Sequence, residues 1–253
     1  MENLFRVDGR KALVTGASRG IGRAVALLLA GAGAEVILVS RDEEALRSLA
    51  DGINSSGGKA HIAPGDVGNP ESVESVFEKV GSITDTLDIL VNNAGISPHY
   101  KSFEKSPEED WDRMYAVNLR GVFLTTKKAF PYLAKRGGSV INVSSIGGII
   151  GLPRIAVYSA TKGALTTFTK SLAWEWARHG IRVNAVCPGF VETEMTAGIR
   201  EHDVLREQCL SRIPLGRFAK PEEIARVVLF LASPASSYVT GHLLIADGGW
   251  TAG

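Results

Sequence analysis

Short apolar runs alternate with longer helical patterns along most of the 253 residues. Several of the runs, such as VILV at 36–39, are continuously apolar and rich in β-branched side chains, which is typical of strands buried on both faces. Strand and helix in alternation favour a parallel sheet whose crossovers place helices on both of its faces. We therefore predict a doubly wound α/β fold with seven strands, at 12–15, 35–40, 60–63, 89–92, 139–143, 182–186 and 243–245.

The helical patterns between these strands begin at residues 21, 43, 70, 111, 158 and 221. No linker rich in Pro, Gly or Ser divides them and no segment repeats, so we expect one domain that spans residues 1–253. In sheets of this kind ligands bind beyond the carboxyl ends of the strands. Functional residues should therefore follow directly after strands in the sequence.

Composition argues against two classes of partner. The chain has 28 Lys and Arg against 27 Asp and Glu, a formal net charge of +1. Proteins that bind nucleic acid or anionic membranes carry an excess or blocks of basic residues, which this chain lacks. The amino terminus has no apolar core of signal-peptide length, and the apolar stretch 24–34 is too short to cross a bilayer. We expect a cytoplasmic protein that binds neither nucleic acid nor membrane.

Neither the cysteines nor the histidines suggest a metal site. Cys187 and Cys209 form no CxxC pair, and we expect both to be small buried apolar residues. The five histidines are dispersed without the spacing of metal ligands, and His99 should lie in a solvated loop. We therefore predict that the protein holds no metal.

The first predicted strand runs directly into TGASRGIG at 15–22 and then into an apolar helix. A turn this tight requires residues without a β-carbon, and the N–H groups at the start of a helix can bind a pyrophosphate. The glycines are spaced GxxxGxG rather than GxGxxG, so a strand-to-helix turn without any ligand remains an alternative interpretation.

Three further motifs follow predicted strands or begin a helix. NNAG at 92–95 ends one strand and NVSS at 142–145 ends another, while YSATK at 158–162 begins a helix. Tyr158 and Lys162 lie one helical turn apart on the same face, so the ammonium can lie beside the phenol. Each motif alone is weak, because Asn at a strand end is often a turn former and a YxxxK pair is usually a solvated helix face. Their occurrence together is what indicates a function.

Together, TGASRGIG, NNAG, Asn118 in AVNLRGVF, Ser145, the Tyr158 and Lys162 pair and PG at 188–189 resemble the short-chain dehydrogenases/reductases. The resemblance covers nearly the whole chain and implies the compact, Rossmann-type form of that family. The chain is most similar to 3-oxoacyl-(acyl-carrier-protein) reductases and bacterial polyol or sugar dehydrogenases, through RIPLGRFAKPEEIARVVLFLAS and YVTGHLLIADGG. The resemblance further implies a homotetramer, in which the last helix and strand pack between subunits, and a lid over the substrate at 190–202.

The resemblance also implies hydride transfer between a nicotinamide and a carbonyl or secondary alcohol. Tyr158 would be the general acid and Ser145 would hold the substrate oxygen. Lys162 would supply a positive charge, and Asn118 would anchor a water that links it to solvent. Ser144 is the alternative to Ser145, but the spacing of thirteen residues to Tyr158 favours Ser145. Lowering the pKa of a phenol from about 10 to about 7 requires about 4 kcal/mol of preferential stabilisation of the phenolate. We expect the positive charges of Lys162 and of the oxidised nicotinamide to provide it.

By the same resemblance, the residues that bind the cofactor lie in the glycine turn, after three of the following strands, at the start of the long helix and after the sixth strand. They are Gly16, Ser18, Arg19, Gly20, Ile21, Gly22, Ser40, Arg41, Asp66, Val67, Asn93, Ala94, Gly95, Tyr158, Lys162, Pro188, Gly189, Val191 and Thr193.

The residues after the second strand favour NADP over NAD. Relatives that prefer NAD typically have an Asp where this chain has Ser40, and Arg41 and Arg19 match positions where relatives that prefer NADP carry a base. Guanidinium groups suit the oxygens of a 2′-phosphate. Alternatively, Arg41 pairs with one of the acids at 42–44, which would weaken the preference.

We predict an NADP(H)-dependent oxidoreductase that acts on a 3-oxoacyl thioester or a small ketone. The alternatives are an NAD-dependent polyol or sugar dehydrogenase and a regulatory protein that binds a dinucleotide without turnover. An acyl carrier protein is a candidate partner, which Lys135, Arg136 and Arg178 could meet near the pocket mouth, although such residues are ordinarily solvated helix caps. The loops around the pocket do not indicate the physiological substrate.

Overall fold

The computed structural model describes residues 4–98 and 100–253, and it contains the predicted seven-stranded sheet. The strands are β1 (Lys11–Thr15), β2 (Glu35–Val39), β3 (Lys59–Ile62), β4 (Ile89–Asn92), β5 (Gly138–Val143), β6 (Ile181–Pro188) and β7 (Leu243–Ala246). Their order is β3-β2-β1-β4-β5-β6-β7 and every neighbouring pair is parallel, which confirms the predicted fold class. Residues 1–3 and His99, on which two expectations rest, lie outside the described residues.

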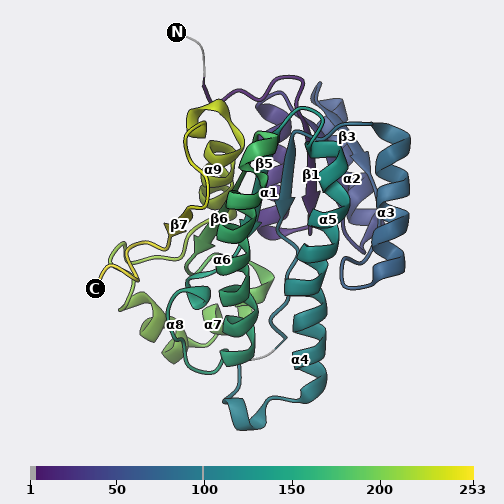
Figure 1. Ribbon diagram of the computed structural model, residues 1–253. Helices are drawn as coiled ribbons and strands as arrows, with labels where there is room; N and C mark the ends of the chain where they lie inside the picture. The colour runs from purple at the N-terminus through teal and green to yellow at the C-terminus, as the bar shows by residue number, and fades with distance from the viewer. Residues whose placement is uncertain (1–3, 99) are drawn as a thin grey trace.

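Helices cover both faces of the sheet (Figure 1). One face packs against α1 (Gly20–Gly31), α2 (Glu43–Ser55) and α9 (Pro221–Ala232), and the other against α3 (Pro70–Ile83), α5 (Gly121–Leu133) and α6 (Ala156–Trp176). The shorter helices are α4 (Glu108–Tyr115), α7 (Ala197–Arg200) and α8 (Asp203–Leu210). These three lie toward the carboxyl ends of the strands, in the lower part of Figure 1.

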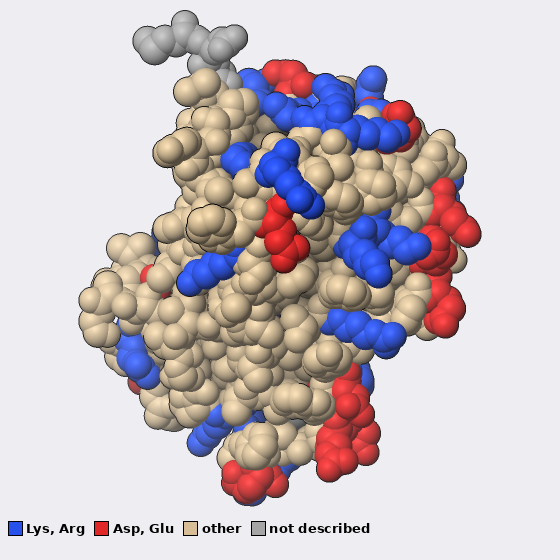
Figure 2. All heavy atoms as spheres, viewed as in Figure 1, with Lys and Arg blue, Asp and Glu red and all other residues tan. Residues whose placement is uncertain are grey.

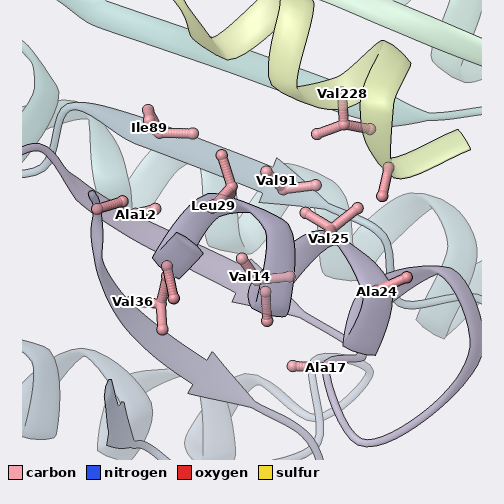
Figure 3. Close-up of a cluster of buried hydrophobic side chains, with 14 of the residues drawn as sticks. Ala12, Val14, Ala17, Ala24, Val25, Leu29, Val36, Ile89, Val91 and Val228 are labelled. Carbon is pink, nitrogen blue, oxygen red and sulfur yellow. The ribbon is translucent and has the colours of Figure 1, made fainter. Parts of the chain in front are cut away.

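Small and β-branched side chains of the central strands form the core beneath α1 and α9 (Figure 3). Val14, Ile89 and Val91 are completely buried and lie beneath Val25 and Leu29 of α1. Because these side chains are compact, α1 packs closely on the sheet. This packing fixes the amino terminus of α1, and with it the glycine turn, beside the end of β1.

The structure differs from the predicted elements in the short helices α7 and α8, which were not predicted, and in the helical pattern expected from residue 111. Helix α4 begins three residues earlier, and the chain forms a π-helical turn, η2 (Ala116–Arg120), between α4 and α5. A π turn inserts an extra residue into the helix, so hydrophobic periodicity alone does not reveal it. The other predicted starts and ends of helices and strands differ from the structure by at most two residues.

Cys187 is completely buried as predicted, whereas Cys209 is only partly buried, because α8 lies on the surface and has no fully buried residue. Within the described ranges, no three His, Cys, Asp or Glu side chains are placed to hold a metal ion. Over the same ranges, no helix combines the length and the apolar character needed to cross a membrane.

Candidate active site

A cavity of about 1100 Å³ lies beyond the carboxyl ends of β1, β2, β4, β5 and β6. The strand order reverses at β1 and β4, and ligands of open α/β sheets bind at such a switch point. The glycine turn, the loops after β4 and β5, the start of α6 and the segment after β6 all contribute to its walls. The fold therefore brings the predicted motifs together in one place.

The glycine turn packs against the residues that follow β4. The Asn93 Nδ2 atom donates to the carbonyl oxygens of Thr15 and Gly16 at 3.0 and 3.1 Å. Gly16 has a φ of +65°, and a β-carbon there would lie 2.9 Å from the Ala94 Cα atom. A β-carbon on Gly22 would overlap both the Gly16 oxygen and the Asn93 amide. Both glycines are therefore needed for the close packing of the turn, independently of any ligand.

The amino terminus of α1 faces the cavity without a side-chain cap. The N-cap residue, Arg19, makes no capping hydrogen bond, and the first turn of the helix contains no acidic residue. Gly20 and Ile21, which begin the helix, line the cavity. Free N–H groups at the positive end of a helix dipole are suited to a pyrophosphate, so this end of the cavity fits the predicted dinucleotide.

Arg41, predicted to bind a 2′-phosphate, lines the cavity beyond β2 and is about two-thirds exposed. Its Nη1 atom lies 3.8 Å from Asp66 Oδ2. The alternative pairing with an acid at 42–44 is not formed: Asp42 caps α2 by accepting from the Ala45 N–H at 3.0 Å, and Glu43 pairs with Arg47. The carboxylate that competes for Arg41 therefore comes from the loop after β3.

Arg19 also has a carboxylate partner. Its Nη1 atom lies 2.6 Å from Glu194 Oε2, which belongs to the segment after β6. Both side chains are about two-thirds exposed, so the pair contributes at most about 1 kcal/mol to stability. The bridge nevertheless links the glycine turn to the opposite wall of the cavity.

The two candidate serines at the end of β5 have different partners. Ser145 accepts from the Gly147 N–H at 3.0 Å and hydrogen-bonds the phenol of Tyr158. Ser144 is buried and donates to the carbonyl oxygen of Lys162 at 2.9 Å. Ser145 is thus the serine that lies against the phenol, in agreement with the spacing in the sequence.

Lys162 is buried and its Nζ atom donates to the Val143 carbonyl oxygen at 2.7 Å, 5.7 Å from the centre of the Tyr158 ring. Burial lowers the pKa of Lys162 to about 8. Burial also raises the pKa of Tyr158 to about 12, although the hydrogen bond from Ser145 opposes this rise. In the chain alone, desolvation of the phenolate outweighs the favourable contacts, so the expected lowering of the phenol pKa stays a prediction for the protein with its nicotinamide bound.

Asn118 lies in the π turn η2 and is completely buried. Its Oδ1 atom accepts from the Ile96 N–H at 2.8 Å, and its Nδ2 atom donates to the Ile96 carbonyl at 2.9 Å and to Thr161 Oγ1 at 3.3 Å. A β-carbon on Gly95 would lie 3.5 Å from Asn118 Oδ1 and 3.4 Å from Lys162 Nζ. The amide thus joins the loop after β4 to α6 beside the buried ammonium.

A chain of buried side-chain hydrogen bonds supports the ends of β4 and β5. Asn92 Nδ2 donates to Thr126 Oγ1 at 2.9 Å and to Asn142 Oδ1 at 2.8 Å. Asn142 Nδ2 donates in turn to Thr169 Oγ1 at 2.9 Å. The sequence favoured turn formation for the paired asparagines of NNAG, whereas Asn92 joins β4 to β5 and α5, and Asn142 extends the chain of hydrogen bonds to α6.

All predicted cofactor-binding residues except Gly22 line the cavity, and so does Ser145. Gly22 lies behind the turn, and Asn118 is buried beside the wall. Other residues that line the cavity were not identified from the sequence, because they lie in loops and short helices without a periodic pattern. They include Ile96, Ser97, Pro98, Arg113, Met195, Thr196 and Arg200.

The fold and the cavity define an α/β protein with a nucleotide-type crevice and a Ser-Tyr-Lys group in its wall. Residues 16–251 match the family model described as Enoyl-(Acyl carrier protein) reductase. The chain belongs to the short-chain dehydrogenase/reductase family.

Three relatives illustrate this membership. The chain is 47% identical to the 3-oxoacyl-(acyl-carrier-protein) reductase FabG of Thermotoga maritima, over 97% of this chain and 99% of that protein. A short-chain type dehydrogenase/reductase from Mycobacterium marinum has a TM-score of 0.93 and 38% identity, with 99% of both chains covered. A gluconate 5-dehydrogenase from Burkholderia cenocepacia, solved with NADP and tartrate, has a TM-score of 0.95 and 37% identity, covering 99% of this chain and 98% of that one.

Proposed function

We propose that this protein is an NADP(H)-dependent oxidoreductase that interconverts a carbonyl and a secondary alcohol. The observation that carries the proposal is a single cavity with two kinds of wall. One is the uncapped start of α1, suited to a pyrophosphate, and the other holds Ser145, Tyr158 and Lys162. The 3-oxoacyl reductase among the relatives favours a 3-oxoacyl thioester or a small ketone as the substrate class.

When bound, the nicotinamide supplies or accepts the hydride. Reduction of a carbonyl creates an alkoxide that must receive a proton, and Tyr158 holds that proton on its phenolic oxygen. Ser145, which hydrogen-bonds the same phenol, would hold the substrate oxygen beside it. Lys162 would stabilise the resulting phenolate by its charge. Asn118, close to Lys162 across Gly95, would anchor a water that returns a proton from solvent.

The choice of NADP rests on Ser40 and the two arginines at the cavity rim. Arg19 and Arg41 are exposed enough to leave their carboxylates and bind a 2′-phosphate, since exposed ion pairs are weak. The gluconate 5-dehydrogenase structure with bound NADP supports the same choice. Titration of wild type and Arg41→Ala with both cofactors tests it, and Arg47→Ala is a matched control because Arg47 does not line the cavity. A wild-type preference for NAD, or unchanged NADP affinity in Arg41→Ala, would contradict the choice.

The function is tested by screening the purified protein with both cofactors against acetoacetyl thioesters, simple ketones, sugars and polyols. Tyr158→Phe should lower turnover by at least about 100-fold while cofactor binding is retained, because only the acidic hydroxyl is lost. Tyr132→Phe is the control, since that hydroxyl contacts the Phe77 carbonyl away from the cavity. Turnover of Tyr158→Phe at the wild-type level would refute the assignment.

Two alternatives make different predictions in the same screen. An NAD-dependent polyol or sugar dehydrogenase would oxidise polyols or sugars with NAD and leave thioesters untouched. A regulatory protein would bind the dinucleotide and turn over nothing. The set formed by Asn118, Ser145, Tyr158 and Lys162 argues against the second alternative, because binding alone does not require all four.

We also propose that the protein is a homotetramer. The surface over α6 is largely uncharged, with charged side chains around its edges (Figure 2). Aromatic side chains are exposed on the helices of this part of the molecule: Trp111 and Tyr115 on α4, Phe123 on α5 and Trp174 on α6. Exposed apolar clusters of this kind commonly mark protein interfaces. Sedimentation of the protein and of Trp174→Glu tests the proposal, and a monomeric wild type would refute it.

An acyl carrier protein as a partner requires a basic surface near the cavity mouth. Lys135 and Arg136 precede β5 and Arg178 precedes β6, so they lie at the amino ends of strands whose carboxyl ends form the cavity. At about 3.3 Å per residue, the six residues of β5 separate the two edges by about 20 Å. These residues therefore do not border the cavity of their own chain, which corrects the expected placement.

A direct comparison decides whether a carrier is used. Activity on a carrier-bound 3-oxoacyl chain that exceeds activity on its small thioester would support docking. Equal activities would count against it. A cytoplasmic location is part of the same proposal, and two unpaired cysteines fit a reducing compartment.

A further inference from the structure

Arg200 ends α7, in the segment that follows β6, and lines the same cavity as Ser145 and Tyr158. One nitrogen of its guanidinium, Nη2, donates to the Thr193 carbonyl oxygen at 3.2 Å. Its Nε atom is buried and makes no hydrogen bond with the described part of the chain. The guanidinium is thus fixed in place with one donor unused.

Of the four other arginines that line the cavity, three have a carboxylate within 4.0 Å: Arg19 with Glu194, Arg41 with Asp66 and Arg113 with Asp110. The fourth, Arg23, is exposed, so water can satisfy its donors. Within the ranges that the structure describes, Arg200 forms no such pair. A buried N–H without a partner is costly, and buried donors in folded proteins are nearly always satisfied. A charged group that keeps an unused donor at a cavity wall is suited to an anionic ligand rather than to the stability of the chain.

We propose that Arg200 is an anion-recognition residue, which donates its Nε–H to a phosphate or carboxylate oxygen of a ligand in the cavity. The proposal rests on the proposed function, because that function defines which anions enter. One source is the pyrophosphate of the dinucleotide and the other is a carboxylate on the substrate.

The surroundings of Thr193 favour the phosphate source. The Thr193 Cγ2 atom lies 3.2 Å from the place of a β-carbon on Gly20, the first residue of α1. The carbonyl that holds Arg200 therefore belongs to a residue in contact with the helix start where the pyrophosphate would bind. A carboxylate of the substrate, beside Ser145 and Tyr158, would enter the same cavity.

The test uses Arg200→Met, which removes the charge, and Arg200→Lys, which keeps the charge but lacks an Nε–H. Arg206→Met is the matched control, because Arg206 lies on α8, pairs with Asp203 at 3.7 Å and does not line the cavity. Thermal unfolding of each variant is recorded first. If Arg200→Met is not folded, Arg200→Lys carries the comparison.

The first arm measures the Kd of NADPH by calorimetry, without turnover. If the pyrophosphate is the partner, Arg200→Met should bind NADPH about 10- to 100-fold more weakly, the loss expected for a hydrogen bond to a charged group, and Arg200→Lys should recover only part of it. The second arm compares KM for acetoacetate, which carries a carboxylate, and for an acetoacetyl thioester, in which that carboxylate is replaced. A rise in KM for acetoacetate alone, with an unchanged Kd for NADPH, would identify the substrate carboxylate.

Values within twofold of the control in both arms would overturn the proposal and leave Arg200 a purely structural residue. A protein that binds NADPH but turns over no substrate would refute the proposed function, while the calorimetric arm still decides the role of Arg200. A wild type that does not bind NADPH would overturn both proposals.

Discussion

Replacing Gly22 by alanine tests why the glycine turn has its sequence. An alanine β-carbon at this position would overlap the Gly16 carbonyl oxygen and the Asn93 amide, and it would lie 2.8 Å from the Gly16 carbonyl carbon. Carbon atoms in contact prefer about 3.5 Å or more, so the helix and the turn must separate by at least about 0.7 Å. That movement weakens the two hydrogen bonds from Asn93 Nδ2 to Thr15 and Gly16.

The expected cost combines three contributions. Overpacking costs about 1–3 kcal/mol and the two weakened hydrogen bonds about 0.5–1.5 kcal/mol each, while the better helix propensity of alanine returns up to about 1 kcal/mol. We expect Gly22→Ala to lower the free energy of unfolding by about 2–4 kcal/mol. For a chain of this length that corresponds to a fall in Tm of about 5–15 °C.

Gly31→Ala is the matched control in the same helix. A β-carbon at Gly31 would meet no atom within 4 Å, and the residue is exposed, so alanine should be neutral or stabilise by up to about 1 kcal/mol. Urea unfolding at one fixed protein concentration measures both variants, because a self-associating protein changes its apparent stability with concentration. If the clash acts through the amide, Gly22→Ala and Asn93→Ala should be strongly non-additive. A Gly22→Ala protein as stable as Gly31→Ala would refute the reasoning.

Three further outcomes are expected. Lys162 has a pKa of about 8 in the folded protein, against an ordinary value of 10.5. Above about pH 8 the unfolded chain therefore binds more protons than the folded protein, so the contribution of Lys162 to the free energy of unfolding rises with pH. Between pH 7.5 and 9.5 the wild type should gain about 2 kcal/mol relative to Lys162→Met in urea unfolding, and a constant difference would contradict the assignment. A thiol reagent at pH 8 should leave Cys187 unmodified in the native protein, because burial raises its pKa to about 11. The partly buried Cys209 should react slowly, and rapid loss of both thiols would contradict this prediction. Asn142→Ala should lose about 2–4 kcal/mol of unfolding free energy, because it removes two buried hydrogen bonds and leaves a cavity, and a loss below about 0.5 kcal/mol would show that the buried chain is dispensable.

The sheet could be predicted from the sequence because parallel strands buried on both faces leave a strong local signal. The run VILV in β2 is apolar without interruption, and a helical pattern follows it in the sequence. The π turn around Asn118 left no such signal, since one additional residue in a helix does not change which side chains are apolar. The prediction therefore found the helix and singled out Asn118, but not the local geometry that directs its side chain towards Ile96.

The motif residues of the site could be found because glycine, tyrosine and lysine occur there at fixed spacings. Arg200 could not be found in this way, because its segment shows no hydrophobic periodicity. Its proposed role follows from the environment of its guanidinium in the folded chain. The alternative partners of Arg41 were sought among the acids next to it in the sequence, whereas the carboxylate within 4.0 Å belongs to Asp66, 25 positions away. Spacing predicts which residues share a helix face, whereas ion pairs between loops depend on tertiary structure.

The pKa values of the wall residues bear on the direction of the reaction. Tyr158, with a pKa of about 12, keeps its proton at neutral pH, and a general acid for carbonyl reduction must be protonated before the step. Lys162, with a pKa of about 8, is close enough to neutrality to give up a proton and restore the phenol afterwards. Oxidation of an alcohol requires the opposite state, a phenolate, which burial disfavours by about 3 kcal/mol relative to an ordinary tyrosine. The phenol of the chain by itself is therefore in the protonated state that carbonyl reduction requires near pH 7.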